Sequence, residues 1–293
     1  MTRTATHSWR IPLSRPDLNG DDRRAVAQVL DSHVLSMGDE SARLEEEFSA
    51  RLDGLSAAVV SSGSAGLYLA LRALGVRDGE VITPSYGFIG TAHAIRLAGA
   101  EPRFADIERD TLCVSAETLE KMFSPSTRAV LPVHIFGTPA PMDEILDLAS
   151  GWGVPVIEDA CEALGSSFCG RPAGTLGDAG VFAFYPNKQM TTGEGGLVVA
   201  RDPELLACVK SMSNQGRGEG EFQFVREGFN FRMTELQAAL GRTQLKRLDG
   251  FLARRQRLAQ RYGEGLSKLQ NISVLGAVAS GAVRSWFVYP VFL

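Results

Sequence analysis

From Ala57 onward, short apolar runs alternate with helical patterns, and this alternation constrains the fold more than any other feature of the chain. Apolar runs that are each followed by a helix are typical of parallel strands buried on both faces of a sheet. We therefore predict an α/β fold with a mostly parallel sheet of about seven strands and helices on both faces. The predicted strands are 57–60, 81–83, 102–105, 129–133, 155–157, 180–184 and 197–200, and the helices between them are 64–74, 89–98, 116–123 and 142–150.

Helical patterns also flank this region. Asn19 or Asp21 can cap a helix that runs through Leu30, and a second pattern spans 41–52. A long pattern covers 235–266, and we expect its basic cluster to be mostly the solvated side of that helix rather than an anion site. The cluster consists of Arg254, Arg255 and Arg257.

The composition excludes several classes of protein. The net charge is −4, so sequence-independent binding of nucleic acid is not expected. No apolar stretch is long enough to span a membrane, and the N-terminus has no apolar core of signal-peptide length. The 4 cysteines form no C-x-x-C pair, which indicates reduced thiols in a cytoplasmic protein and no metal site.

Three strand ends carry residues that could do chemistry, because ligands of open α/β sheets bind beyond the carboxyl ends of the strands. The first is "VVSSGSAGLYLAL", in which a buried strand leads through Gly63 into a helix. The free N–H groups of Ser64, Ala65 and Gly66 would lie at the positive end of the helix dipole, where phosphate binds. An ordinary turn capped by serine is the alternative interpretation.

The second strand end is "PVIEDACEALGS", where Glu158 and Asp159 close an apolar strand and Glu162 follows. A carboxylate there costs desolvation unless a cation or a donor meets it, and a protonated heterocyclic nitrogen would suit Asp159. The alternative is a helix N-cap with a capping-box acid.

The third is "GVFAFYPNKQMTTGEGGLVVA", which places Lys188 in a loop between two apolar strands. A lysine held in such a loop can be desolvated and then form a Schiff base with an aldehyde. An ordinary surface lysine is the alternative. Taken together, a phosphate cradle, an acid for a ring nitrogen and a lysine nucleophile are the parts needed to hold pyridoxal phosphate.

The sequence resembles the DegT-type sugar-nucleotide aminotransferases, which are fold type I pyridoxal-phosphate enzymes. The matching phrases extend over nearly the whole chain, and the long one around Lys188 is the most specific. They are "IPLSRPDL", "SSGSAGLYLALRALG", "EVITPSYGFIGTAHAI", "AVLPVHIFGTPAPMDEI", "VIEDACEALGSSFCGRPAGTLGDAGVFAFYPNKQMTTGEGGLVV" and "GFNFRMTELQAALG".

The resemblance implies roles for individual residues. Lys188 would hold the cofactor as a Schiff base and then move the proton, Asp159 would pair with the pyridine nitrogen, and Glu162 would lie near the ring's 3′-oxygen. Gly63, Ser64 and Ala65 would bind the phosphate. Phe88 would stack on the ring, and Asn230 would reach the phosphate of the neighbouring subunit, so that the active sites of a homodimer lie at its interface.

The chain also departs from the family pattern. Ala183 stands where many members have a serine that donates to the phosphate, and Thr138 replaces a common glutamine. Members continue well beyond "SWFVYPV", so the resemblance implies a cofactor-binding large domain in 1–248 and an incomplete small domain in 249–293. The final "WFVYPVFL" reads as an uncovered strand, which fits a missing C-terminal portion.

The expected function is transfer of an amino group from an amino acid, glutamate by expectation, to a keto sugar on a nucleotide, with no nucleic-acid or membrane partner. A sugar dehydratase on the same scaffold is an alternative, but such members carry histidine at the position of Lys188. A non-catalytic pyridoxal-phosphate-binding regulator, or an inactive truncated relative, is the other.

Overall fold

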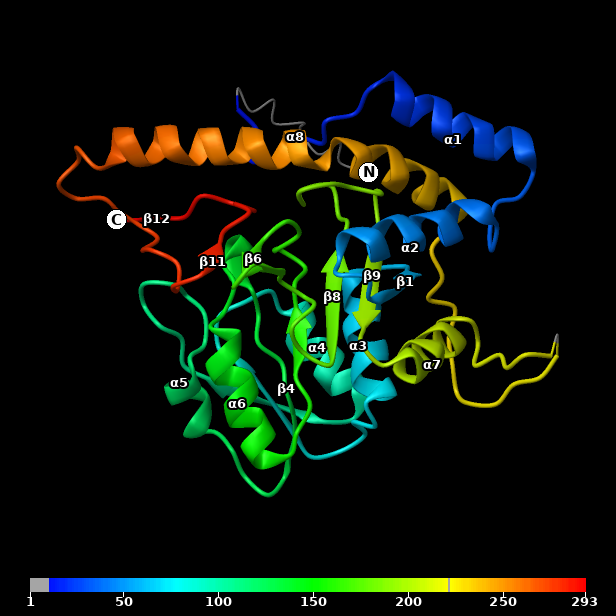
Figure 1. Ribbon diagram of the computed structural model, residues 1–293, viewed down its shortest axis with the longest axis horizontal. Helices are drawn as coiled ribbons and strands as arrows, with labels where there is room; N and C mark the ends of the chain where they lie inside the picture. Colours follow the sequence, from blue (N-terminus) through cyan, green and yellow to red (C-terminus); the bar gives the residue numbers. More distant parts are fainter. Residues whose placement is uncertain (1–10, 221) are drawn as a thin grey trace, which may run out of the picture.

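The computed structural model of the protein describes residues 11–220 and 222–293, and its centre is a sheet built from two hydrogen-bonded groups of strands (Figure 1). The four-stranded group has the order β1 (Ser56–Val60), β9 (Gly196–Ala200), β8 (Ala179–Ala183), β5 (Ile157–Asp159). The three-stranded group has the order β3 (Glu101–Ala105), β2 (Glu80–Pro84), β4 (Thr127–Val130).

Strand direction decides which strand ends share an edge. β5 runs parallel to β8, and β2 runs parallel to both β3 and β4. β9 is antiparallel to β1 and to β8, so these two neighbours of β9 run in the same direction. Isolated parallel bridges join Val130 to Val156 and Val133 to Asp159, and they bring the two groups edge to edge. The predicted α/β class and mostly parallel sheet are confirmed.

Both faces of the sheet are buried, because successive side chains of a strand point to opposite faces. In β1, Ala58 and Val60 pack on one side, whereas Ala57 and Val59 pack on the other. The first side is covered by α3 (Gly63–Ala73), α4 (Gly90–Ala98) and α7 (Pro203–Ser213). The second side is covered by α2 (Asp39–Arg51), α8 (Glu235–Leu266), α5 (Ala116–Glu120) and α6 (Met142–Trp152).

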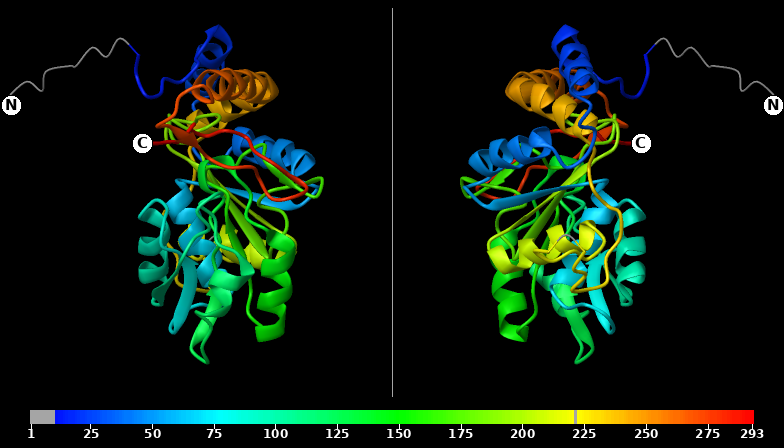
Figure 2. Two further views of the ribbon diagram at one scale, coloured as in Figure 1. Left: turned by 90° about the vertical axis from the view of Figure 1, so that its left-hand side faces the viewer. Right: turned by 90° about the vertical axis from the view of Figure 1, so that its right-hand side faces the viewer.

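Figure 2 shows α4 and α6 on opposite sides of the sheet. Every helix predicted between strands is present, and α7 is an additional helix outside the predicted set. Within the described residues, no helix has an apolar stretch long enough to cross a bilayer.

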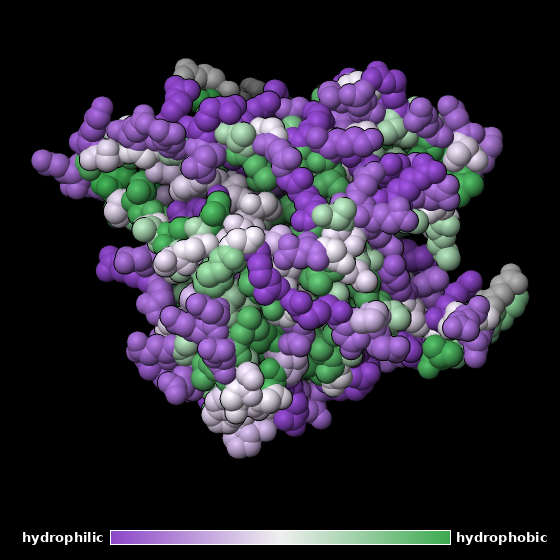
Figure 3. Space-filling view, in the orientation of Figure 1, coloured by the Kyte–Doolittle hydropathy of each residue, from purple (hydrophilic) through white to green (hydrophobic). Residues whose placement is uncertain are grey.

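Two helices form an upper layer over the sheet. α1 (Gly20–Ser32) is closed at its start by Asn19, which takes part in a capping box with Asp22. α1 lies along α8, which crosses the top of the molecule (Figure 1). The surface of this layer is mainly hydrophilic on the side seen in Figure 3. α8 continues without a break through residue 248, the predicted end of the large domain, and that boundary stays a prediction.

The predicted C-terminal strand is mostly wrong. Trp286 has a φ of 55°, a left-handed conformation that a strand cannot include. Instead, the N–H groups of Ser285 and Phe287 donate to the carbonyls of Gly137 and Phe136, at 3.1 Å each. Only β12 (Val291–Phe292) is strand, and it pairs with β10 (Ser273–Val274). A further small sheet contains β11 (Ala282–Val283), β6 (Ser167–Phe168) and β7 (Arg171–Pro172).

Candidate active site

The three strand ends singled out in the sequence lie at one edge of the sheet. β1, β8 and β5 all run in the same direction within the four-stranded group. Their carboxyl ends lead to the Gly63 turn, to the Lys188 loop and to Asp159, respectively. The fold therefore brings the predicted phosphate cradle, lysine and acid to a single edge, as the sequence predicted.

The turn after β1 leaves no room for a side chain at Gly63. A Cβ atom there would lie 2.8 Å from the Cβ of Ala183 and 2.8 Å from the Sγ of Cys161. The hydroxyl of Ser62 caps α3 by accepting from the N–H of Ala65 at 3.1 Å. Ser64 is exposed, and within the described chain its N–H has no acceptor. The expectation of three free N–H groups is therefore wrong for Ala65 and for Gly66, whose N–H donates to the Ser62 carbonyl at 3.0 Å, and the N–H of Ser64 is the one of the three that is open to an anion.

Asp159 is buried at the end of β5, with 5% of its surface exposed. One carboxylate oxygen accepts from the hydroxyl of Thr91 at 2.7 Å, and the other accepts from the N–H of Cys161 at 3.1 Å. With only these two donors, the Asp159 carboxylate can accept a further hydrogen bond. Thr91 is a site residue that the sequence reasoning missed, although it lies in the quoted phrase "SYGFIGTAHAI".

Glu158 points to the opposite face and is wholly structural. It is fully buried, and its two oxygens accept four hydrogen bonds. One oxygen meets His134 Nε2 at 2.8 Å and the N–H of Gly174 at 2.8 Å, and the other meets the N–H groups of Leu176 and Gly177 at 2.7 Å each. The Nδ1 atom of His134 accepts from the N–H of Ala140, so the proton is assigned to Nε2.

Lys188 points toward Glu162 and an aromatic ring. Its Nζ lies 3.6 Å from Glu162 Oε1 and 4.3 Å from the ring centroid of Phe287, and the Lys188 and Glu162 side chains are each 13% exposed. The other oxygen of Glu162 accepts from the N–H of Phe136 at 2.8 Å. Burial raises the pKa of Glu162, and the nearby charge of Lys188 opposes that rise.

Cys161 lies at the centre of these groups. Its Sγ contacts the Gly63 turn, and the charges of Asp159, Lys188 and Glu162 all act on it. Burial, reinforced by Asp159, raises the pKa of this thiol well above its ordinary value, so it stays a neutral thiol. The N–H of Cys161 donates to Asp159 and its Sγ lies beside the Gly63 turn, so the acid at the end of β5 and the glycine turn are neighbours.

The loop that carries Lys188 is closed at its base. The N–H of Phe184 donates to the carbonyl of Gly195 at 2.9 Å, and the N–H of Thr192 donates to the carbonyl of Phe184 at 3.0 Å. Next to the lysine, the Gln189 amide donates to the Glu162 carbonyl and to the Ser285 hydroxyl. The loop is therefore tied to the Glu162 segment as well as to itself.

Phe88 and Asn230 lie at the surface. Phe88 is 73% exposed. Its ring and the hydroxyl of Ser64 both border Gly90, because a Cβ atom added there would lie 3.0 Å from Phe88 Cδ1 and 3.0 Å from Ser64 Oγ. Asn230 is exposed, and the carbonyl of the next residue, Phe231, accepts from the N–H of Ser61 at 2.8 Å. Stacking of Phe88 on a cofactor ring and reach of Asn230 into a second subunit stay predictions.

The basic cluster of α8 is only partly solvated. Arg254 and Arg257 are exposed, as expected, but Arg255 is partly buried and the expectation is wrong for it. Its guanidinium donates to three main-chain carbonyls, those of Lys188, Trp286 and Phe287. Burial lowers the pKa of Arg255. Sequence periodicity could not find this role, because the partners lie far away along the chain.

The two departures from the family pattern have structural neighbours. Ala183 packs directly against the Gly63 turn, so a serine hydroxyl there would face the cradle. Thr138 is fully buried, and its hydroxyl accepts from Arg284 Nε at 2.8 Å. Burial also lowers the pKa of Arg284. Thr138 therefore gives a buried guanidinium an acceptor, which accounts for a polar residue at this position.

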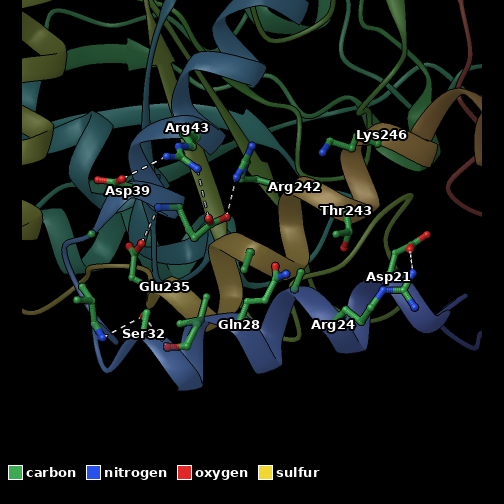
Figure 4. A pocket seen from close by; sticks show the side chains of 16 residues that line it. Asp21, Arg24, Gln28, Ser32, Asp39, Arg43, Glu235, Arg242, Thr243 and Lys246 are labelled. Carbon is green, nitrogen blue, oxygen red and sulfur yellow. Dashed lines mark hydrogen bonds and ion pairs between the residues drawn. The ribbon is translucent and has the colours of Figure 1, made fainter.

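A cavity of about 560 Å³ between α1, α2 and α8 is not part of this site (Figure 4). The charged residues around it are largely paired with one another, Arg43 with Asp39 and Arg242 with Glu40. Glu235 is buried, and its carboxylate accepts from the first N–H groups of α2. The polar residues that line this cavity therefore hold α1, α2 and α8 together.

A smaller cavity of about 290 Å³ adjoins Lys188 itself. It lies between the 13–17 segment, the lysine loop and α8, and the ring of Phe287 forms part of its wall. Asn187 also lines it and has a buried side-chain oxygen without a hydrogen-bond partner.

Comparison with known proteins agrees with this geometry. Residues 16–293 match the DegT/DnrJ/EryC1/StrS aminotransferase family. The chain belongs to that family. A GDP-perosamine synthase of Caulobacter vibrioides is 36% identical over 287 residues, which are 97% of this chain and 77% of the relative.

Solved structures of aminotransferases superpose closely. The aminotransferase TlmJ of Streptoalloteichus hindustanus gives a TM-score of 0.92 at 34% identity, covering 96% of this chain and 78% of the other. A candidate sugar aminotransferase of Streptococcus pneumoniae, solved in its PLP-form, gives 0.90 at 26% identity, with coverages of 96% and 77%. The predicted family and the predicted enzyme class, a transaminase, are confirmed.

Proposed function

We propose that this protein uses pyridoxal phosphate to transfer an amino group from an amino acid, glutamate by expectation, to a keto sugar carried on a nucleotide. The observation that carries the proposal is the convergence of the Gly63 turn, Asp159 and Lys188 at one edge of the sheet. The names of the relatives, a GDP-perosamine synthase and a sugar aminotransferase, support the class of acceptor.

The residues present fit the cofactor. At the Gly63 turn the exposed N–H of Ser64 is free to meet a phosphate, and the missing Cβ lets the turn pack against Ala183 and Cys161. The Asp159 carboxylate has room for one more donor, which a protonated ring nitrogen supplies. Lys188 is a largely buried amine at the same edge. When bound, the cofactor supplies an aldehyde for the amine and a ring that withdraws electrons.

Each residue then has one task. Gly63, Ser64 and Ala65 would hold the phosphate, with the Ser64 N–H as the free donor, and Asp159 would keep the ring nitrogen protonated. The Lys188 amine would hold the cofactor through its aldehyde and would carry the proton in both half-reactions. Glu162, which is 3.6 Å from Lys188 Nζ, orients that amine.

A second copy of the chain completes the site in this proposal. Asn230 would contact the phosphate bound by the partner, and Phe88 would cover the ring. The exposure of both side chains leaves them free for such contacts.

The test is a spectroscopic half-reaction with the purified protein and pyridoxal phosphate. The parent and Lys246→Ala, which changes an exposed lysine of α8, should show the visible absorbance of a Schiff base, and Lys188→Ala should lack it. Added glutamate should convert the parent's cofactor to the pyridoxamine form.

The possible outcomes separate the alternatives. An unchanged band in Lys188→Ala refutes the assignment of this lysine. A normal band that no amino acid converts identifies a protein that binds the cofactor without transamination. Loss of oxygen from a keto-sugar substrate without its amination identifies a dehydratase.

A further inference from the structure

Arg255 joins the lysine loop to the segment that covers the lysine. Its Nη2 donates to the carbonyl of Lys188 at 3.1 Å, and its Nη1 donates to the carbonyls of Trp286 and Phe287 at 3.0 Å and 2.8 Å. The ring of Phe287 lies over the Lys188 amine. One guanidinium thus holds the backbone of the lysine and the backbone of the residue that packs on its amine.

The pairing of this arginine differs from that of three other arginines of α8. Arg242, Arg247 and Arg254 each form an ion pair with a carboxylate. Among the described residues, Arg255 has no such partner, although it is partly buried. A charge that is desolvated against neutral carbonyls costs stability compared with an apolar side chain of similar size. Stability alone therefore does not explain an arginine here.

The geometry of the guanidinium does explain it. Its donors form a rigid planar fork, so carbonyls from two separate segments can be held at fixed relative positions. A lysine ammonium is a single point that cannot reach the same set of acceptors in one arrangement. The segment it holds contains Trp286, which has a left-handed φ of 55°, and Phe287, whose ring lies over the lysine amine.

We propose that Arg255 is a positioning residue for Lys188: it fixes the lysine backbone and, through Phe287, the place of the amine. This inference rests on the proposed role of Lys188 in holding the cofactor. Arg255 acts through its carbonyl partners and takes no proton.

The experiment measures attachment of pyridoxal phosphate to Lys188 in the cofactor-free protein. The adduct is trapped with borohydride at set times and located by peptide mass spectrometry. The variants are Arg255→Lys, Arg255→Gln and Phe287→Leu, which removes the ring but keeps the carbonyl. Arg257→Gln is the matched control, because Arg257 is exposed on the same helix. Thermal unfolding of each variant is measured in parallel.

We expect both Arg255 variants to slow attachment at Lys188 by about 10- to 100-fold, the cost of a misplaced reacting group. Phe287→Leu should slow it less, and Arg257→Gln should match the parent. In the reconstituted enzyme, Arg255→Lys should lower kcat while KM for the amino donor changes by less than about twofold, because binding is not the step affected.

Attachment in Arg255→Lys at the rate of Arg257→Gln would overturn the proposal, and so would a kcat equal to the parent's. A purely structural role would lower the unfolding temperature and leave the attachment rate of the folded protein unchanged, which also overturns it. If Arg255→Gln does not fold, Arg255→Lys and Phe287→Leu decide the question. Failure of the parent to form an adduct at Lys188 would instead refute the proposed function.

Discussion

Replacing Glu158 by glutamine tests how the strand end that carries Asp159 is held. The carboxylate is fully buried, and each of its oxygens accepts two hydrogen bonds. Glutamine has nearly the same shape but replaces one acceptor oxygen by an NH₂ group, which only donates. Whichever way the amide turns, its NH₂ group faces two donors.

The cost follows from counting those donors. In one orientation the N–H groups of Leu176 and Gly177 lose their acceptor, and in the other the N–H of Gly174 and the ring of His134 do. A tautomer change in His134 does not help, because its other nitrogen already accepts from Ala140. Two orphaned buried donors at about 1–3 kcal/mol each give a loss of about 2–6 kcal/mol.

The assay is urea unfolding of the cofactor-free protein at neutral pH. A loss of this size is a large fraction of the roughly 5–15 kcal/mol that stabilises a typical protein. Glu46→Gln changes an exposed glutamate and should shift the free energy of unfolding by no more than about 0.5 kcal/mol. If Glu158→Gln lowers it by less than about 1 kcal/mol, the carboxylate is not the acceptor of these four bonds.

Two further predictions concern the site itself. Gly63→Ala would place a Cβ 2.8 Å from Ala183 Cβ and Cys161 Sγ, and it should lower the free energy of unfolding in urea by about 1–3 kcal/mol. It should also weaken cofactor binding, as measured by equilibrium dialysis. Gly151→Ala is the control, because a Cβ at this position of α6 meets no other atom, and it should raise the free energy of unfolding by up to about 1 kcal/mol. Equal effects of the two substitutions on unfolding would contradict the tight packing at Gly63. Because burial raises the folded-state pKa of Glu162 above its ordinary 4.5, the folded state binds more protons, and this carboxyl destabilises the fold as pH rises past 4.5. Glu162→Gln should therefore gain stability relative to the parent as pH rises from 4.5 toward neutrality, and a difference independent of pH in cofactor-free unfolding would refute the shift.

The sheet and the main catalytic candidates could be predicted from the sequence because local signals carry them. A buried strand such as β1 is a short apolar run, and Gly63 and Ser64 follow its end at Val60 after two serines. The common direction of the strands then places Asp159 and Lys188 at one edge with no knowledge of side-chain contacts. The antiparallel position of β9 was not predictable from its apolar pattern, which looks the same in either direction.

The rest depends on contacts between distant segments. Arg255 lies 67 residues from Lys188 along the chain and looks like any arginine in a basic helix. Thr91 is a helix residue whose link to Asp159 appears only once α4 lies beside β5. The apolar run near the C-terminus favours a strand locally, but its backbone donors are taken by the carbonyls of Phe136 and Gly137.

The closed base of the 184–195 loop has a consequence for how the amine travels during turnover. The chain is fastened at Phe184, at Thr192 and, through Arg255, at the Lys188 carbonyl. In the proposed reaction, rotations about the bonds of the lysine side chain are then the means by which its nitrogen would move between two carbon atoms. The proposed reaction then needs no hinge in the main chain, because the movement would be confined to one side chain on a loop that is fastened at three points.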